Sequence, residues 1–490
     1  MGKSVLSRRS FIKGATAAGT GALILPTTGV FGANDSVNVG VIGCGGRGRG
    51  HIKWAEKSGA RVVAVCDADT EHMDMGANMA GNPASVKKYQ DLRDLLNDKN
   101  VDAVIIATPN HWHALATVMA CQAGKDVYVE KPASHSIWEG RKMVEAAHKY
   151  KRIVQVGTQQ RSDPALITLR KLIENKELGE VEWIHSLWYA ERKSIGKVKS
   201  PQPIPENIDY DLWCGPREVV PLMRKKLHYD WHWFWPYGNG DMGNRVVHNI
   251  DDVHFIMQMG NDIPTRMMAV GGRFKYNDDA TTPNTESIFA DWKVPIIFGS
   301  RNMPFVHPKT GVAKGTSVYK RFGNKFRFTN IVKCEDGYFA ATRGGGAVFN
   351  NDGKKIRKIK GDGGGKHMKN FINAVKSRRA EDLHARIDNS YMGNLMMLIG
   401  NISYRCGETA DVDTISEQVD YCEEGRETWR QMQEHLALNN VDLKTERATL
   451  GPWLTFDPKR LRFTGKGAAR ANSFVREDMR KQYSIPETFN

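Results

Sequence analysis

The feature that most constrains the fold of this chain is a glycine-rich turn placed directly after a buried strand. Residues 37–42 (VNVGVI) predict that strand, and the next residues set Gly43, Gly45 and Gly48 in a G-x-G-x-x-G spacing. The first glycine permits a tight turn, the second lets the backbone approach a pyrophosphate, and the third lets the following helix pack on the strand. The chain is therefore expected to start its folded part with a dinucleotide-binding unit.

A second strand, predicted over 61–66, ends in Asp67, 19 residues past the last glycine. A carboxylate at this position bonds the ribose hydroxyls of the adenosine, and it disfavours the 2′-phosphate of NADP. Arg47 and Arg49 in the glycine turn partly offset that repulsion. The sequence thus predicts NAD as cofactor, with NADP as the less favoured alternative.

Strand-like and helix-like segments continue to alternate after Asp67. Strands are predicted at 101–108 and 126–129, with a helix at 113–123 between them. Such alternation gives an α/β fold with a doubly wound parallel sheet. A fold of this type that binds no nucleotide remains an alternative at this stage.

Composition narrows the function classes. The 490 residues suggest two to four domains, and no apolar stretch reaches the length that crosses a bilayer, so a multi-span membrane protein is excluded. The net charge is +15, from 70 Lys+Arg and 55 Asp+Glu, but the basic residues are scattered except in the tail, 459–481. No nucleic-acid partner is expected, and the tail is interpreted as a solvated or subunit-contact face in preference to a phosphate-binding one.

The N-terminal segment, 1–33, has the pattern of a twin-arginine export signal. Arg8 and Arg9 precede Phe11 and Lys13, a weakly apolar run without acids follows, and small residues end it. An ordinary basic N-terminus is the alternative. The pattern predicts a periplasmic or otherwise exported protein, and because such substrates cross folded, a cofactor acquired in the cytoplasm would travel with it.

Cysteine and histidine spacing predicts neither a disulfide framework nor a metal centre. The seven cysteines are widely separated and contain no C-x-x-C pair. His111 and His113 lie two residues apart without a third ligand candidate, which is a weak metal pattern. No metal is required.

The segments ATPNHWH (107–113) and EKP (130–132), together with the glycine turn and Asp67, resemble the glucose-fructose oxidoreductase, inositol dehydrogenase and rhizopine-catabolism (Gfo/Idh/MocA) family. The resemblance implies a second α/β domain with a large open, mostly antiparallel sheet whose outer face commonly makes subunit contacts. A homo-oligomer is therefore expected. The implied domain bounds are 34–157 for nucleotide binding, 158–425 for substrate and oligomerisation, and 426–490 for a C-terminal extension.

The resemblance also implies an active site. In members that are dehydrogenases, the lysine of the E-K-P motif, here Lys131, sits beside the nicotinamide and the reacting carbinol. The family's D-x-x-x-H element places its histidine at His248, but Asn244 stands where the aspartate is usual. An amide can orient a hydroxyl but cannot take a proton, so His248 is the expected proton acceptor. Structural roles for Lys131 and His248 are the alternatives.

The remaining expected contacts follow from the same resemblance. The predicted cofactor-binding residues are Gly43, Gly45, Arg47, Gly48, Asp67, Thr108, Asn110, His113, Glu130, Lys131 and Gln159. The predicted substrate-binding residues are Arg161, Trp233, Trp235 and Asp251. Tryptophans in HYDWHWFWPY (228–237) suit the apolar faces of sugar rings, although a packed strand with alternating Trp231, Trp233 and Trp235 explains them equally well.

These observations predict an exported NAD(H)-dependent oxidoreductase acting on a secondary hydroxyl or keto group of a sugar, polyol or glycoside, with a tightly held cofactor. Redox-neutral, NAD-assisted cleavage of a glycoside is a second hypothesis, motivated by Asn244 and the export signal. A non-catalytic carbohydrate-binding protein is the third.

Overall fold

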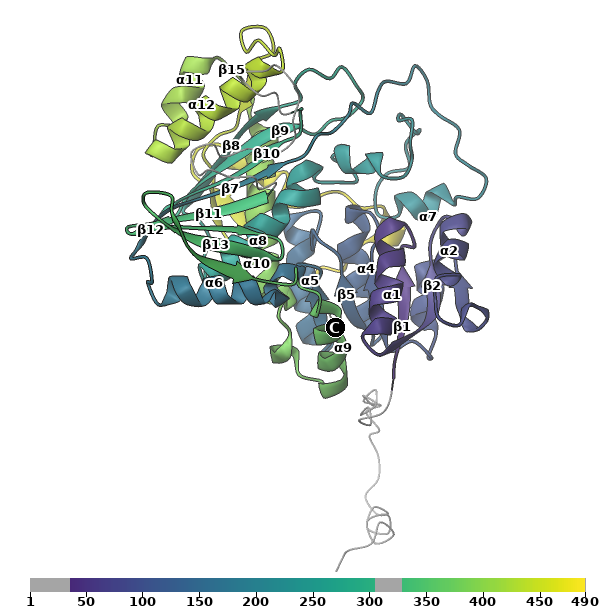
Figure 1. Cartoon of the computed structure of the whole chain (residues 1–490). Coiled ribbons are helices and arrows are strands. Elements are labelled where there is room, and N and C mark those ends of the chain that lie inside the picture. Colours follow the sequence, from purple (N-terminus) through teal and green to yellow (C-terminus); the bar gives the residue numbers. More distant parts are fainter. Residues whose placement is uncertain (1–35, 305–327, 490) are drawn as a thin grey trace, which may run out of the picture.

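The glycine turn follows a strand at the centre of a parallel sheet. The computed structural model describes residues 36–304 and 328–489 (Figure 1). Its first sheet has six strands in the order β3-β2-β1-β4-β5-β6, the dinucleotide-binding order. The strands are β1 (Val37–Ile42), β2 (Ala60–Cys66), β3 (Lys87–Tyr89), β4 (Ala103–Ile106), β5 (Asp126–Val129) and β6 (Val154–Val156). The predicted doubly wound parallel sheet is confirmed.

Helices cover both faces of this sheet because its strands are apolar on both sides. The helices that connect its strands are α1 (Gly46–Lys57), α2 (Thr70–Ala77), α3 (Leu92–Asn97), α4 (Asn110–Gln122) and α5 (Ile137–Lys149). A further helix, α9 (His367–Ser377), returns from far along the chain and packs Phe371 and Val375 against the face that carries Val39 and Val41. The predicted bounds assign α9 to the substrate domain, 158–425, whereas in the structure it packs on the nucleotide-binding sheet.

The second domain is built on a ten-stranded mixed sheet. Its order is β14-β13-β12-β11-β7-β10-β9-β8-β16-β15, and within it β7 and β10 pair in parallel. The strands are β7 (Val181–Tyr189), β8 (Arg266–Gly272), β9 (Thr285–Asp291), β10 (Pro295–Arg301), β11 (Phe328–Cys334), β12 (Gly337–Thr342), β13 (Gly345–Asn350), β14 (Lys355–Lys360), β15 (Glu408–Ala410) and β16 (Ala448–Leu450). The large, mostly antiparallel sheet that the resemblance implied is therefore present.

Helices pack on both faces of this sheet in the part formed by β8, β9 and β10. Met267 and Ala269 on β8 face the main core, which includes α10, whereas Met268 and Val270 face the opposite side, against Trp429 of α12. The helices of this domain are α6 (Pro164–Glu174), α7 (Tyr210–Cys214), α8 (Val247–Ile256), α10 (Ile387–Cys406), α11 (Val412–Val419) and α12 (Glu423–Leu438). The outer face is thus partly covered by α11 and α12 instead of fully open.

The chain after α12 returns to the nucleotide-binding domain. It contains β17 (Thr455–Asp457), β18 (Arg462–Thr464) and α13 (Ala468–Asn472). The amide of Trp138 donates to the carbonyl of Val475 (2.9 Å), and the amide of Arg480 donates to the carbonyl of Pro216 (3.0 Å). Within the basic tail, Glu477 forms an ion pair with Arg217 at 3.1 Å. The tail therefore packs on its own chain, and the predicted start of the extension at 426 falls inside α12.

Residues 1–33, for which a twin-arginine export signal is predicted, lie outside the described residues. Among the helices that are described, none combines the length and apolar character needed to cross a bilayer.

Candidate active site

The glycine turn forms a cradle that side chains would fill. Gly43 has φ +88°, and a Cβ there would lie 2.7 Å from the carbonyl of Ala107. A Cβ on Gly48 would lie 1.8 Å from the carbonyl oxygen of Gly43. Among the described residues no side chain caps α1, so the amides of its first turn are available to an anion, and the turn fits a dinucleotide pyrophosphate.

Asp67 closes the adenosine end of the same groove. Its carboxylate accepts the amides of Cys44 (2.6 Å) and Asp69 (3.0 Å), which join the end of β2 to the glycine turn. Burial raises the pKa of Asp67. The carboxylate lines the groove, where it fits the ribose hydroxyls.

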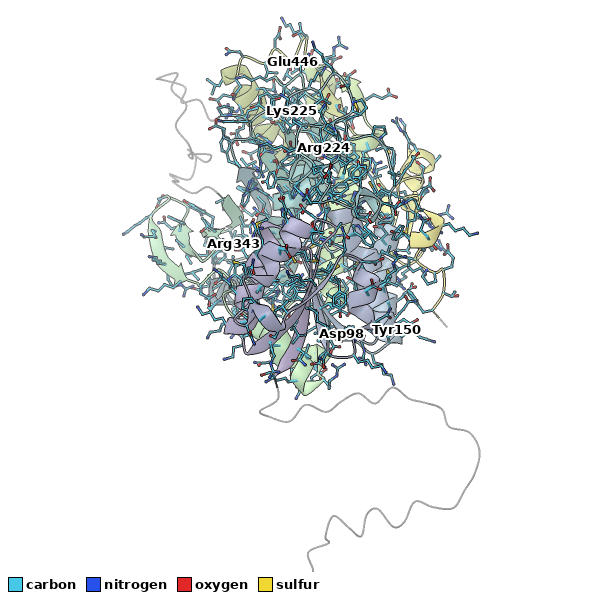
Figure 2. All side chains as sticks on the ribbon, turned by 90° about the vertical axis from the view of Figure 1, so that its right-hand side faces the viewer. Asp98, Tyr150, Arg224, Lys225, Arg343 and Glu446 are labelled. Carbon is cyan, nitrogen blue, oxygen red and sulfur yellow. The ribbon has the colours of Figure 1, made fainter. Side chains whose placement is uncertain are left out.

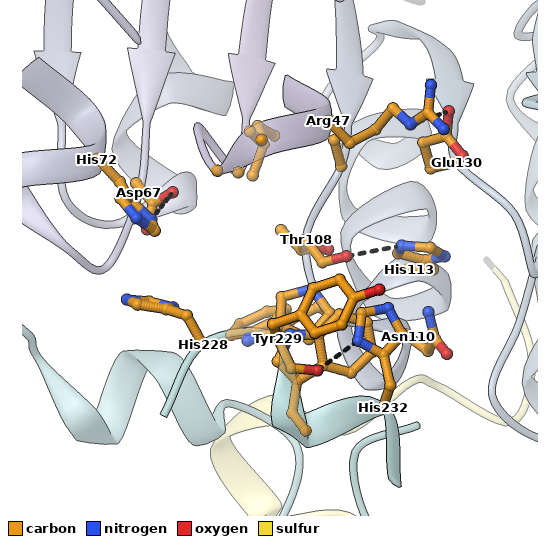
Figure 3. A pocket seen from close by; sticks show the side chains of 18 of the residues that line it. Arg47, Asp67, His72, Thr108, Asn110, His113, Glu130, His228, Tyr229 and His232 are labelled. Carbon is orange, nitrogen blue, oxygen red and sulfur yellow. Dashed lines mark hydrogen bonds and ion pairs between the residues drawn. The ribbon is translucent and has the colours of Figure 1, made fainter. Parts of the chain in front are cut away.

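The groove widens into a cavity of about 600 Å³ between the two domains (Figure 3). From the predicted set, the residues that line it are Gly43, Gly45, Arg47, Asp67, Thr108, Asn110, His113, Glu130, Lys131, Asn244 and His248. The structure therefore brings the three predicted catalytic residues together with most of the predicted cofactor ligands.

Glu130 anchors the E-K-P segment. Its carboxylate lies 2.8 Å from Nε2 of the buried His51 and 3.7 Å from Nε of Arg47. Burial alone would raise the pKa of Glu130, but the His51 hydrogen bond and the charge of Arg47 hold it well below its usual range. Gln159 also donates to Glu130 (3.2 Å), so it lies behind the cavity wall and supports this carboxylate.

Lys131 reaches across to the second domain. Its ammonium donates to the carbonyl of Asn244 at 2.5 Å. Burial lowers the pKa of Lys131 to about 8; the charge of Glu130 opposes this shift, and the charges of Arg47 and Arg245 add to it. A lysine with this pKa can both stabilise an alkoxide and relay a proton near neutrality.

Asn244 and His248 meet at an irregular helix start. A π-helical turn, Met242–Val246, runs directly into α8, and such turns often mark functional sites. Within the described part of the chain, neither Nδ2 of Asn244 nor Nδ1 of His248 has a hydrogen-bond partner. Burial and the charges of Arg343 and Lys131 hold the pKa of His248 well below its usual range. The imidazole is therefore neutral near pH 7 and can accept a proton.

His111 and His113 hold the loop that precedes the cavity. The two ring nitrogens of His113 lie 2.7 Å from the carbonyl of Pro132 and 3.0 Å from that of Thr108. Nε2 of His111 lies 3.1 Å from the carbonyl of Trp213. These contacts fix Thr108 and the start of α4 against the E-K-P segment.

The predicted substrate-binding residues lie elsewhere. Arg161 and Asp251 face one another in a buried, two-bond ion pair at 2.7 and 2.8 Å. Trp233 is buried with the guanidinium of Arg192 over its ring, and Trp235 lies beside Arg405. None of these four lines the cavity, so the structure gives them packing and ion-pair roles.

The alternative explanation of the tryptophan-rich segment, a packed strand with alternating tryptophans, is wrong. Tyr229 has φ +68°, and residues 230–233 form a 3-10 helix, so Trp231, Trp233 and Trp235 do not alternate across a sheet. Of these three tryptophans only Trp231 lines the cavity. The other aromatic residues that line it include Trp112, Trp188, Trp213 and Tyr229.

Sequence reasoning also missed several charged and polar lining residues. They are His72, Gln90, Asp91, His228, His232, Arg245 and Arg343. Arg245 adjoins Asn244 and could have been found from that adjacency. Arg343 follows β12 in a short hairpin turn, and no local pattern marks it.

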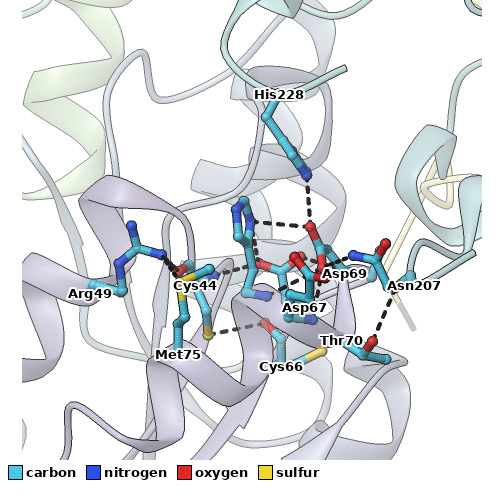
Figure 4. Close-up of polar contacts among 12 residues, drawn as sticks. Cys44, Arg49, Cys66, Asp67, Asp69, Thr70, Met75, Asn207 and His228 are labelled. Carbon is cyan, nitrogen blue, oxygen red and sulfur yellow. Dashed lines mark hydrogen bonds and ion pairs between the residues drawn. The ribbon is translucent and has the colours of Figure 1, made fainter. Parts of the chain in front are cut away.

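Residues 190–237 of the second domain, which we call the strap, reach the adenosine end of the groove, where Figure 4 shows Asn207 and His228 beside Asp69. Backbone amides of Thr70 and Asp209 pair with the carbonyls of Asn207 (2.9 Å) and Ala68 (3.0 Å). Nε2 of His228 lies 2.9 Å from the carboxylate of Asp69. The strap is thus bonded to the nucleotide-binding domain on the side where the adenosine fits.

Polar groups gather where the strap meets α2. Ligand atoms of Asp69, His72 and His228 lie within 4.8 Å of one another, and these residue types can hold a metal ion. The amide of Asn207 donates to the same Asp69 carboxylate at 2.7 Å. Hydrogen bonds from Asn207 and His228 hold the Asp69 carboxylate in this cluster.

Comparison with known proteins gives the same picture. The chain matches the model of the oxidoreductase family with NAD-binding Rossmann fold over residues 37–158, and that of the family's C-terminal alpha/beta domain over 177–308. It is 32% identical over 180 residues to an inositol 2-dehydrogenase of Salmonella typhimurium, covering 36% of this chain and 53% of that protein. An inositol 2-dehydrogenase of Saccharopolyspora erythraea is 35% identical over 155 residues, covering 31% and 45%.

The chain thus spans about half the length of these curated relatives. Among solved structures, a levoglucosan dehydrogenase in complex with NADH and levoglucosan has a TM-score of 0.55 at 16% identity, over 74% of this chain and 96% of that one. This likeness supports the two-domain fold. With both family domains matched in order and the glycine turn, E-K-P lysine and His248 converging on one cavity, the chain belongs to the Gfo/Idh/MocA family of NAD-binding oxidoreductases.

Proposed function

We propose that this protein is an exported NAD(H)-dependent oxidoreductase that interconverts a secondary hydroxyl and a keto group on a sugar, polyol or glycoside. The observation that carries the proposal is the convergence of Lys131, Asn244 and His248 in the cavity that continues the glycine turn. All three present polar groups in a partly buried site, where electrostatic stabilisation is stronger than in open water.

The side chains divide the reaction between them. Neutral His248 takes the hydroxyl proton, while the ammonium of Lys131 stabilises the developing alkoxide. The free amide of Asn244 donates to a substrate oxygen and orients the carbinol. The nicotinamide, when bound, accepts the hydride from the carbinol carbon, so the substrate loses one proton and one hydride.

The names of similar proteins favour a polyhydroxylated substrate. Two are inositol 2-dehydrogenases, and a protein of similar fold is a levoglucosan dehydrogenase. Aromatic rings of Trp188, Trp213 and Trp231 around the cavity suit the apolar faces of such rings.

The strap supports a cofactor that stays bound between turnovers. Bonds from the strap to Ala68, Asp69 and Thr70 must break before the adenosine end of the groove opens. Asp67 supports NAD over NADP for the reason given above. We propose that one substrate reduces this cofactor and a second carbonyl compound reoxidises it.

Export rests on the twin-arginine pattern alone. Fractionation of cells that express the chain, with R8K/R9K as the comparison, tests it. We expect the natural sequence to accumulate outside the cytoplasm and the R8K/R9K variant to remain inside. If both proteins stay in the cytoplasm to the same extent, export is contradicted.

Redox-neutral glycoside cleavage remains the second candidate. This reaction needs a second group that can accept a proton, besides His248. Transient oxidation of one ring carbon makes the neighbouring carbon acidic, and Lys131, with a pKa of about 8, can remove the proton from that neighbour. Product analysis separates the two: a keto sugar supports oxidoreduction, and released aglycone without net oxidation supports cleavage.

The primary test uses the purified protein. Its released nucleotide is identified by mass, and the near-ultraviolet absorbance of reduced nicotinamide is followed as sugars, polyols and glycosides are added. A response to one of them supports the proposal. Sugar binding with no change in nicotinamide redox state, and no effect of K131A, would establish the carbohydrate-binding alternative instead.

A further inference from the structure

Two arginines of the second domain point to the substrate's chemistry. Arg245 lies in the π-helical turn beside Asn244, and Arg343 lies in the turn between β12 and β13. Figure 2 shows Arg343 where this hairpin approaches the nucleotide-binding domain. Both line the cavity that holds Lys131 and His248.

Neither arginine has a carboxylate partner among the described residues. The guanidinium of Arg245 lies over the ring of Trp188 at 4.8 Å, and its buried Nε has no hydrogen-bond partner. Arg343 donates only to the neutral side chain of Gln159, at 3.3 Å. Two fully buried arginines, Arg161 and Arg217, each bond a carboxylate at 2.7 Å, whereas Arg245 is half-buried and Arg343 is exposed at the cavity wall.

The acids whose charges act on these arginines already have partners. Asp241, near Arg245, is paired with Arg192 at 3.0 Å, and Asp252, near Arg343, accepts hydrogen bonds from Gln160 and Asn330. The end of the cavity beside His248 therefore carries uncompensated positive charge. Positive charge that lines a cavity and is not offset by a neighbouring carboxylate attracts an anionic ligand.

Groups of the first domain, not these two arginines, are placed to bind the pyrophosphate of the cofactor. The free amides of α1 and the side chain of Arg47 lie at the glycine turn, in the first domain. Arg245 and Arg343 come from the second domain and line the cavity together with His248, which belongs to the same domain. The two arginines thus belong to the substrate end of the cavity.

We propose that the substrate carries an anionic group, a carboxylate, sulfate or phosphate ester on the sugar or polyol, and that Arg245 and Arg343 bind it. This inference rests on the proposed function and adds the class of substrate. A guanidinium offers paired donors that match such oxyanions, and stacking on Trp188 holds the plane of Arg245 in place.

Calorimetry of the NAD-loaded protein tests this without turnover. The probes are glucose, galactose and mannose, each against its uronate, 6-phosphate and 6-sulfate. At least one acid is expected to bind about tenfold or more tightly than its neutral partner, the difference that a charge-assisted hydrogen bond makes. Which acid is preferred distinguishes carboxylate from phosphate and sulfate.

The variants R245Q and R343Q are expected to reduce that preference to about threefold or less while NAD stays bound. The matched control is R357Q, which removes one positive charge from an exposed position on β14 of the same domain and should keep the preference. R343K, which retains the charge without the paired donors, should fall between R343Q and the natural sequence.

Three results would overturn the inference: no acid that binds more tightly than its neutral partner, an unchanged preference in both arginine variants, or loss of NAD binding in those variants with the preference intact. The proposed oxidoreductase function fails separately. If neutral sugars reduce the cofactor and the acids bind no more tightly than their neutral partners, the oxidoreductase function is supported and the anion site is contradicted. If acids bind through both arginines but the redox state of the nicotinamide never changes, the anion site is supported and the oxidoreductase function is contradicted.

Discussion

Replacing Lys131 by Met removes an ammonium that lines the cavity with His248 and should slow carbinol oxidation by about 10² to 10³. An ammonium has three donors, and Lys131 uses one on the carbonyl of Asn244, so two remain for the alkoxide oxygen. With a pKa of about 8, about nine-tenths of Lys131 is charged at pH 7 and about a tenth at pH 9. Because the charged form is the active one, kcat/KM should fall above pH 8, well below the ordinary lysine range.

The assay is kcat/KM against pH for the natural sequence, K131M and K131R, with nucleotide content measured for each. K131M should keep its NAD and show a low, flat profile over this range. K131R, which stays charged, should lack the fall above pH 8 whatever activity it retains. Activity of K131M within about threefold of the natural sequence, or a natural profile that stays level to pH 10, would refute the role assigned to this lysine.

The other predictions concern the base, the buried ion pair and the strap. H248N should lower kcat by about 10² to 10⁴ and leave bound NAD unchanged, as shown by turnover and nucleotide release; unaltered kcat would exclude His248 as base. R161M should lower the free energy of unfolding in urea by about 3–5 kcal/mol because Asp251 stays buried without its partner, and a loss confined to substrate affinity would instead restore the predicted binding role. H228A should release NAD about tenfold faster in an exchange assay, since a hydrogen bond to the Asp69 carboxylate is lost; an unchanged rate would mean that the strap does not retain the cofactor.

What the sequence predicted well depends on local backbone chemistry. The strand at 37–42, the glycine turn, Asp67 and the alternation of strands and helices after it follow from the hydrophobic period and the spacing of glycines. Lys131 and His248 were predicted to meet because the resemblance supplied a pairing that no local rule contains. The structure places both in one cavity.

What the sequence could not predict depends on distant packing. Trp188 and Arg343 reach the cavity only through the register of the ten-stranded sheet, which their own neighbours in sequence do not encode. Arg161 and Asp251 have residue types suited to substrate binding, but their mutual ion pair is set by how α8 packs. The tryptophan-rich segment has the composition of a strand, whereas the left-handed Tyr229 turns it into a 3-10 helix.

The most direct test of the central claim is to denature the purified protein, identify the released nucleotide by mass, and compare the nicotinamide absorbance of the intact protein before and after sugars and polyols are added. The account predicts NAD or NADH in near-stoichiometric amount and a redox change with at least one compound. Protein that carries no nucleotide, and shows no redox change even when NAD or NADP is supplied, would contradict it.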